Sequence, residues 1–588
     1  MNNSADRSEL CIDLPEPFYK RFLKRFSIPV FISFLFFAFS FFTVIYYITG
    51  PSEGFLHSDC TDSLLWAYAT VETGEIIAQD FIYAAILPFS SNLWMIPIIN
   101  IFGYTMTAQI VSMVIFAILF SASLIWVFHN LRLSLALNFT ASGCVLMLLS
   151  SSVKMREIMW EHVIYYSLAL LLINCILSLS LTALRAWKEF CDKNEKNAFI
   201  KFIVTLVFLA IITTGTATNG IQLILMTTIP VFVGVVAEVF FNSKEKLLST
   251  KNIGCGAVAV TLPFCSLLGL LILGHIKGDV EVWYTNYYSQ LSSIENWQAN
   301  LFKFHKHFLT LIGFDDTKKN FFPAEGAESI LTDTAIYNIL SIAVFALLIL
   351  IPIIGAFFYK KYKNKETKVA IISYLTLFLA ILFLFVCGNI SNVNWRLVPV
   401  VGGAMLPIFA MVNELVLSYK TRITKETEES EQNGSLGMRL ASLIVAVFLL
   451  FSVVNISIIR KIPEDYGRNN TLHQLTEVLI EKDLTYGFAT FWNSQAITLL
   501  SDSKVSCRDV NATAEDGVKI YSYQTFNRWY EPQEGVDKYF VILSGPEYMK
   551  VLRNSTWAEW TENQLIETIT DVEGFYIFVF DGYLQGIK

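Results

Sequence analysis

Two aspartates follow the first long apolar run of the chain, in the segment HSDCTD at residues 57–62. A carboxylate in a partly desolvated cleft can take a proton from an alcohol, which is the work of a general base. If the chain is helical from about residue 60, Asp62, Trp66 and Ala69 share one face and Asp59 stands at the helix start. Both aspartates can equally cap that helix, with Asp59 at the N-cap and Asp62 in the first turn. Spacing alone leaves both interpretations open.

A second group of charged residues lies between two later apolar runs, in the segment KMREIMWEH at residues 154–162. Acidic and basic side chains at the mouth of a membrane span mark a functional site by default. Glu157 and Glu161 are therefore candidate site carboxylates, and Arg156 is a candidate substrate contact. The alternative is that Lys154 and Arg156 are interfacial anchors paired with Glu157.

A third candidate is the segment Asn394-Trp395-Arg396, which stands at the entrance of another apolar run. The planar guanidinium of Arg396 can hold a phosphate through two parallel hydrogen bonds. Trp395 beside it offers an aromatic surface to a substrate. The alternative is an arginine that extends its charge toward water beside an interfacial tryptophan.

The composition indicates where these segments must sit. Of 588 residues, 54% are hydrophobic and 16% charged, and the net charge is −7. Soluble domains have about a quarter charged residues, so this composition excludes an ordinary cytosolic enzyme and a disordered chain. The absence of a basic surplus argues against nucleic acid as a partner. Nine cysteines show no metal-ligand spacing, so we predict no metal site.

Long apolar runs predict an α-helical polytopic membrane protein, because a bilayer core of about 30 Å needs roughly 20 apolar residues per helix. We count about eleven such spans, at residues 28–48, 104–128, 133–152, 163–186, 199–216, 221–241, 253–275, 336–359, 369–387, 397–418 and 438–459.

Charge predicts the orientation of these spans, because cytoplasmic loops are enriched in Lys and Arg. Residues 50–103 contain no Lys or Arg, whereas alternate loops are basic, near residues 185–201, 244–251, 360–368 and 420–425. We therefore place the N-terminal segment 1–27 in the cytoplasm, and the loops 50–103 and 276–335 outside. The transmembrane domain is 28–459, in a plasma membrane that we take to be bacterial.

The last part of the chain, residues 460–588, has no long apolar run and is predicted to be a small exoplasmic α/β domain. Residues 471–482 have helical spacing, while residues 486–491, 539–543 and 575–580 resemble strands. The domain shows no Gly-rich phosphate loop and no nucleophile elbow.

The order and spacing of several residues resemble the GT-C glycosyltransferases, such as the protein O-mannosyltransferases and the aminoarabinose transferase of lipid A. In those families an acidic residue after the first span is followed by an Ala, a Gly, a Pro-containing turn and a juxtamembrane helix that ends in Phe-Gly. This chain has, in that order, Asp59, Ala67, Gly74, Pro88-Phe89 and a segment from Asn92 to Phe102-Gly103. It departs from the pattern at Cys60, where a second acidic residue is usual, and at Leu87, where a basic residue often precedes the proline.

This resemblance implies an inverting transferase that moves a sugar from a polyprenyl-phosphate donor to an acceptor hydroxyl on the exoplasmic face. Asp59 would be the general base, and Glu161 a second catalytic carboxylate. Arg396 would contact the phosphate, and further substrate contacts would come from Asp62, His57, Arg156 and Trp395. No cofactor is required by the resemblance, although a divalent cation assists the leaving phosphate in some relatives. The acceptor is a protein, a lipid or a glycan.

Two other classes share many spans and aromatic-rich loops. A transporter or flippase of lipid-linked saccharide usually has broken helices at midplane and repeated halves, and no such repeat is evident in the sequence. A polysaccharide polymerase or ligase has a large outer loop dominated by basic residues, whereas residues 50–103 carry none.

Overall fold

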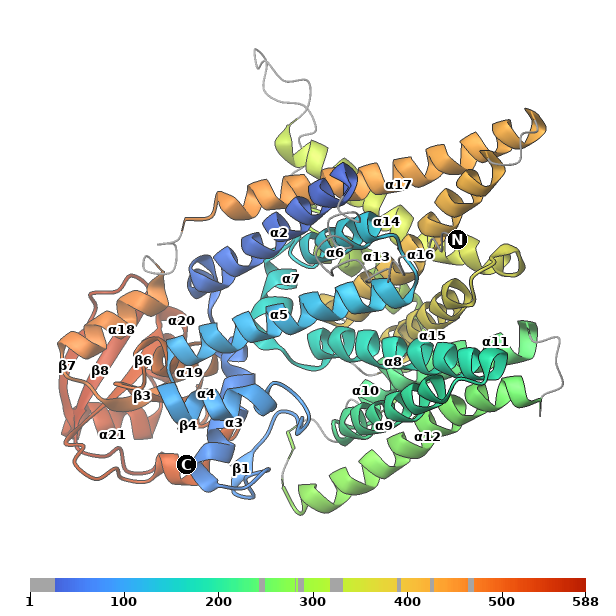
Figure 1. The fold of residues 1–588 in the computed structure, drawn as a ribbon. Helices are drawn as coiled ribbons and strands as arrows, with labels where there is room; N and C mark the ends of the chain where they lie inside the picture. The colour runs from blue at the N-terminus through green and yellow to red at the C-terminus, as the bar shows by residue number, and fades with distance from the viewer. Residues whose placement is uncertain are drawn as a thin grey trace, which may run out of the picture.

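The computed structural model describes residues 27–242, 249–280, 282–283, 290–317, 332–388, 393–423, 428–463 and 470–587 (Figure 1). Residues 1–26 of the predicted N-terminal segment lie outside the described residues. So do parts of the predicted basic loops 244–251 and 420–425 and of the predicted loop 276–335.

The described chain contains the predicted bundle of apolar helices, which makes it an integral, multi-pass membrane protein. Ten helical segments are long and apolar enough to cross a bilayer: α2 (Ile28–Thr49), α5 (Met106–Asn130), α8 (Tyr165–Lys193), α9 (Lys196–Thr218), α10 with α11 (Ile221–Met226 and Thr228–Asn242), α12 (Thr250–Lys277), α14 (Asp333–Phe357), α15 (Lys365–Cys387), α16 (Val398–Ile423) and α17 (Glu428–Arg460).

The predicted eleventh span is a broken helix. It begins as α6 (Leu135–Leu148) and continues, after a bend of 111°, as α7 (Val153–Glu157) and a π-helical turn (Ile158–His162). Ser152 caps α7, because its hydroxyl accepts a hydrogen bond from the Met155 amide. The bend directs the charged segment 154–162 across the end of the bundle instead of along it.

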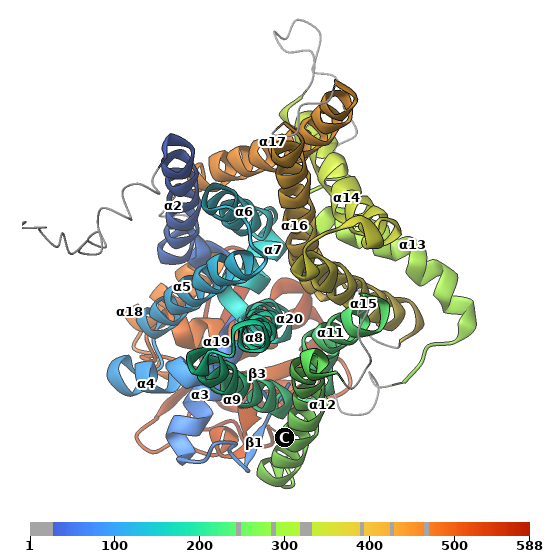
Figure 2. The ribbon, with the colours of Figure 1, turned by 45° about the vertical axis from the view of Figure 1, so that its right-hand side comes forward.

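Helices α8 and α16 form the centre of the bundle, and Figure 2 shows them near its middle. In each, 83% of the apolar span is buried, against 22% in the peripheral helix α2. A helix that is apolar all round is packed on all sides by its neighbours. We therefore expect residues at the ends of α8 and α16 to be held in fixed positions.

The first loop, residues 50–103, is mostly helical. Its elements are two 3₁₀ turns (Pro51–Phe55 and Ser58–Thr61), helix α3 (Asp62–Thr73), strand β1 (Phe81–Ile82) and helix α4 (Asn92–Phe102). Gly74 ends α3 with a φ of +75°, and Gly103 ends α4 with a φ of +73°. These left-handed positions favour glycine, so both glycines noted in the sequence have a conformational role.

The C-terminal domain lies at one end of the bundle (Figure 1). Its described elements are α18 (Thr471–Glu481), β2 (Tyr486–Thr490), α19 (Phe491–Leu500), β3 (Ser506–Thr513), β4 (Gly517–Ile520), β5 (Thr525–Phe526), β6 (Lys538–Ser544), α20 (Gly545–Val551), α21 (Ser555–Asn563), β7 (Leu565–Ile569) and β8 (Phe575–Asp581).

A six-stranded sheet in the order β4-β3-β2-β6-β8-β7 forms the core of this domain, with β2 parallel to both β3 and β6. The predicted helix and three predicted strands are α18, β2, β6 and β8. The fold class is therefore confirmed: an α-helical polytopic membrane protein with a small C-terminal α/β domain.

The C-terminal domain contacts the first loop through a second, two-stranded sheet, in which β5 pairs antiparallel with β1. The buried Phe526 ring packs edge-on against Phe81, with ring centroids 4.8 Å apart. Arg528 pairs with Asp80 and, at 2.7 Å, with Glu72. Apolar packing and charge therefore fasten two segments that are far apart in the sequence.

We expect the apolar contact to carry most of this attachment. Replacing Phe526 by Ala removes a fully buried ring and should cost about 3–5 kcal/mol, whereas Arg528→Ala removes exposed ion pairs worth about 0–1 kcal/mol. Thermal denaturation and limited proteolysis of the purified protein should show a lower midpoint and faster cleavage for Phe526→Ala than for Arg528→Ala. Equal losses in the two variants would contradict this division.

Candidate functional site

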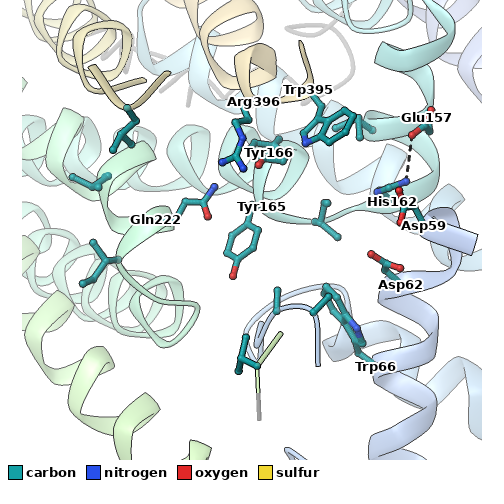
Figure 3. A pocket seen from close by; sticks show the side chains of 18 of the residues that line it. Asp59, Asp62, Trp66, Glu157, His162, Tyr165, Tyr166, Gln222, Trp395 and Arg396 are labelled. Carbon is teal, nitrogen blue, oxygen red and sulfur yellow. Dashed lines mark ion pairs between the residues drawn. The ribbon is translucent and has the colours of Figure 1, made fainter. Parts of the chain in front are cut away.

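A cavity of about 530 Å³ opens where the first loop, the broken span and the C-terminal domain meet (Figure 3). Its walls come from seven parts of the chain. The polar and aromatic residues that line it are Asp59, Asp62, Trp66, Glu157, His162, Tyr165, Tyr166, Gln222, Trp395, Arg396 and Tyr523. The cavity thus brings together five of the candidates from the sequence, Asp59, Asp62, Glu157, Trp395 and Arg396, from three segments that are far apart in the chain.

The two aspartates of the first loop form one wall of the cavity. Asp62 is buried, with 6% of its surface exposed, and α3 begins at this residue. No side chain caps α3 or the preceding 3₁₀ turn, so the capping interpretation is wrong. Burial raises the pKa of Asp62 well above its ordinary value, and the neighbouring charge of Asp59 adds to the effect.

Asp59 is the more accessible of the two carboxylates. Burial raises its pKa, the nearby His57 lowers it, and Glu157 raises it again. A carboxylate whose pKa is raised holds a proton more strongly than an exposed one, so it is a better proton acceptor once ionised. Asp59 therefore has the environment that a general base needs.

Gln524 of the C-terminal domain fixes Asp62. Its Nε2 donates to Asp62 Oδ1 at 2.7 Å, while its Oε1 accepts from Trp66 Nε1 at 2.6 Å. Gln524 is almost fully buried and has a φ of +53°, a left-handed conformation that is uncommon for a residue other than glycine. The C-terminal domain therefore holds a strained residue against the carboxylate wall, an arrangement for which the sequence gives no signal.

Arg396 forms the opposite wall, together with Tyr166 and Gln222 (Figure 3). It lies in the 3₁₀ turn Asn394–Leu397 that leads into α16. Arg396 also borders a second, smaller hollow of about 30 Å³ whose other residues are almost all apolar, including Met226 and Phe385. Arg396 thus stands between the main cavity and a smaller, more apolar hollow.

Trp395 also lines the cavity, and its ring lies beneath Lys154, whose Nζ is 5.2 Å from the ring centroid. Lys154 Nζ pairs with Glu157 Oε2 at 2.5 Å, as the anchor interpretation expected. Glu157 Oε1 in turn lies 3.3 Å from His57 Nε2 and 3.5 Å from His162 Nε2. Glu157 therefore contacts three side chains at this wall, those of Lys154, His57 and His162.

Three of the predicted site residues are not among the residues that line the cavity: His57, which pairs with Glu157, and Glu161 and Arg156, which lie behind the wall. Glu161 is buried and accepts hydrogen bonds from Tyr47 Oη at 2.6 Å and Cys60 Sγ at 3.2 Å. Arg156 is also buried, where it donates to the Ser150 carbonyl at 2.9 Å and lies over the Tyr47 ring. Arg156 is therefore no interfacial anchor, and both residues brace the site from behind.

Several other charged residues lie away from the cavity. Asp80 pairs with Arg528 on the outside of the first loop. Lys303, His305 and Lys306 are exposed on α13 (Ile294–Leu311). A carboxylate wall and a guanidinium wall across one chamber can bind an anionic group on one side and activate a hydroxyl on the other.

Comparison with known proteins finds similarity among solved structures. No protein-family model and no curated protein matches the chain. Among solved structures, ArnT from Cupriavidus metallidurans bound to undecaprenyl phosphate is 11% identical, with a TM-score of 0.50 over 94% of this chain and 99% of that one. ArnT in the apo state matches with a TM-score of 0.50 and 11% identity over 93% and 97% of the two chains.

A third match is the apo form of the oligosaccharyltransferase from Archaeoglobus fulgidus, 11% identical, with a TM-score of 0.46 over 88% of this chain and 69% of that one. The two matches to ArnT extend over nearly the whole of both chains, from the membrane helices to the C-terminal domain. This protein therefore has the fold of ArnT.

Proposed function

We propose that this protein is an integral-membrane glycosyltransferase, which moves a sugar from a polyprenyl-phosphate donor to an acceptor hydroxyl. The observation that carries the proposal is the single cavity that places Asp59 and Asp62 across from Arg396. The ArnT structure of the same fold was solved with undecaprenyl phosphate bound, which supports a donor of this chemical type.

The donor phosphate would bind at Arg396. Its guanidinium can form two parallel hydrogen bonds to phosphate oxygens, and the apolar side chains Leu384 and Phe385 beside it would contact the first part of a prenyl chain. Arg396 is the one Lys or Arg among the described residues that line the cavity. A divalent cation, when bound, would supply further positive charge to the departing phosphate.

The acceptor hydroxyl would approach from the side of Asp59. As the hydroxyl oxygen attacks the anomeric carbon, Asp59 takes its proton, and the bond from that carbon to the phosphate oxygen breaks with its electron pair leaving on the phosphate. Attack from the side opposite the phosphate inverts the configuration. Asp62 and Trp395 would contact the sugar, and the braced Glu161, Arg156 and His57 would position the wall.

The orientation we propose puts the cavity and the C-terminal domain on the exoplasmic side and the N-terminus in the cytoplasm. The first loop, which has no Lys or Arg, contacts the C-terminal domain, so both face the same compartment. Lys193 and Lys196 lie at the junction of α8 and α9, at the opposite end of α8 from the cavity residue Tyr165. Basic loops remain on the cytoplasmic side, in a membrane that we take to be the bacterial plasma membrane.

Replacing Asp59 by Asn tests the base. The amide keeps the shape and removes the proton acceptor, so turnover should fall by roughly 10²–10⁴-fold, measured as release of polyprenyl phosphate in membranes supplied with polyprenyl-phosphate sugars. Asp80→Asn is the matched control, a carboxylate of the same loop outside the cavity, and should retain activity. Equal turnover by wild type and Asp59→Asn would remove the base, and movement of intact lipid-linked sugar without bond cleavage would indicate a flippase.

Replacing Arg396 by Gln tests the phosphate site. Loss of charge-assisted hydrogen bonds worth about 1.5–3 kcal/mol should weaken binding of undecaprenyl phosphate by about ten- to a hundredfold, measured on protein in lipid nanodiscs. Lys303→Gln, which removes an exposed cation from α13, is the control and should bind normally. Unchanged affinity in Arg396→Gln would place the phosphate elsewhere.

A further inference from the structure

Three side chains with metal-binding atoms meet at the cavity wall that carries Asp59. His57, Cys60 and His162 each offer one ligand atom, and these atoms all lie within 4.8 Å of one another. His57 and Cys60 flank Asp59 in the first loop, whereas His162 ends the π-helical turn of the broken span. The two segments are far apart in the sequence, so no spacing rule could have revealed the cluster.

The two histidines of this cluster have buried ring nitrogens that lack a hydrogen-bond partner among the described residues. Within the described part of the chain, neither ring nitrogen of His162 has a hydrogen-bond partner, and neither does Nδ1 of His57. His162 is 4% exposed, so water does not readily satisfy it. A buried polar atom left unpaired costs about 1–3 kcal/mol, and such atoms in folded proteins call for an explanation such as an ion.

The contacts around the cluster match those of a zinc site. Glu157 Oε1 lies 3.3 Å from His57 Nε2 and 3.5 Å from His162 Nε2. Glu157 thus partners Nε2 of His57 and lies near Nε2 of His162 without forming a hydrogen bond to it, which leaves Nδ1 of both rings for a metal. A carboxylate partner on the outer nitrogen of a ligating imidazole is common in zinc sites. Imidazole nitrogen and thiolate sulfur together favour zinc over magnesium or calcium, which prefer oxygen ligands.

Cys60 has a proton acceptor beside it. Its fully buried Sγ donates a hydrogen bond to Glu161 Oε2 at 3.2 Å. Only the thiolate binds zinc, so binding releases the thiol proton, and the Glu161 carboxylate is placed to receive it. Zinc bonds of about 2.0–2.3 Å would draw the three ligand atoms closer together than they now lie.

We propose that His57, Cys60 and His162 bind one zinc ion, which ties the first loop to the turn of the broken span. Asp59 lies between two of these ligands in the sequence, so the ion would fix the backbone on either side of the cavity's most accessible carboxylate. Two contacts already join the same segments, because the Ser63 hydroxyl donates to the His162 carbonyl and, at 3.4 Å, to the Val163 carbonyl. Val163 itself has a φ of +42°. A β-branched residue rarely adopts this backbone conformation. A metal ion bound by the neighbouring His162 would help to hold Val163 in it. The inference does not depend on the proposed transferase activity.

Cobalt is the probe for this site, because a thiolate bound to Co²⁺ gives a charge-transfer absorption that oxygen and nitrogen ligands do not. The full chain, purified with an affinity tag that contains no histidine, is stripped with a chelator and titrated with Co²⁺. We expect one equivalent to produce the band, and one equivalent of Zn²⁺ to abolish it. A wild-type protein that shows no such band would overturn the proposal, and this measurement requires no variant to fold.

Variants then identify the ligands. Cys60→Ser and His162→Gln should each lose the band and retain much less zinc by mass spectrometry of the purified protein. Cys144→Ser, which changes a buried cysteine of α6, and His305→Gln, which changes an exposed histidine of α13, should behave as wild type. Zinc retained at one per chain in both Cys60→Ser and His162→Gln would assign the metal to another place. Metal content is measured without substrate, so its outcome is independent of the test of Asp59.

Discussion

The cavity depends on a buried carboxylate that is satisfied from a different domain. Asp62 loses its hydration on burial, and an unpaired buried acceptor would cost more than most single contacts contribute. Gln524 compensates by donating to Asp62, and it also accepts from Trp66 one turn further along α3. Because these hydrogen bonds join residues of two different parts of the chain, the docked C-terminal domain holds Asp62 and Trp66 of the first loop in place.

The membrane imposes the second constraint. Irregular backbone is tolerated at the edge of a helical bundle only where other protein groups satisfy it. Gln109 of α5 does this for both loops, since its Nε2 lies 3.0 Å from the Cys60 carbonyl and 3.0 Å from the Glu161 carbonyl. One rigid span thus sets the separation of the 57–62 segment and the broken span, and every ionisable group of the carboxylate wall belongs to one of these two segments.

The sequence predicted what local patterns determine. Eleven apolar runs became ten long helices and one bent pair, and α18, β2, β6 and β8 appear where periodicity placed them. Strands β3 and β7 were missed because Arg508, Asp509 and Glu567 interrupt their apolar pattern. The convergence of Asp59 with Arg396 followed from the family resemblance, whereas Gln524 and the cluster around His162 depend on contacts between distant segments. The sequence also could not show which carboxylate of the 154–162 segment faces the cavity: Glu157 does, and Glu161 is turned toward Tyr47.

The far end of the bundle bears on the choice between transfer and transport. There, Arg132 Nε pairs with Glu366 at 2.6 Å, and the Arg132 carbonyl accepts from Asn413 at 3.1 Å, which links α15 and α16 to the turn between α5 and α6. Arg185 of α8 bonds Asn130 of α5 beside them. A flippase must open its two ends in alternation, so these part-buried contacts would have to break in each cycle, together with those that join the C-terminal domain to the first loop. A transferase needs only the end that carries Asp59 and Arg396, where a lipid-borne phosphate and an acceptor hydroxyl can enter the same chamber from the bilayer and from water.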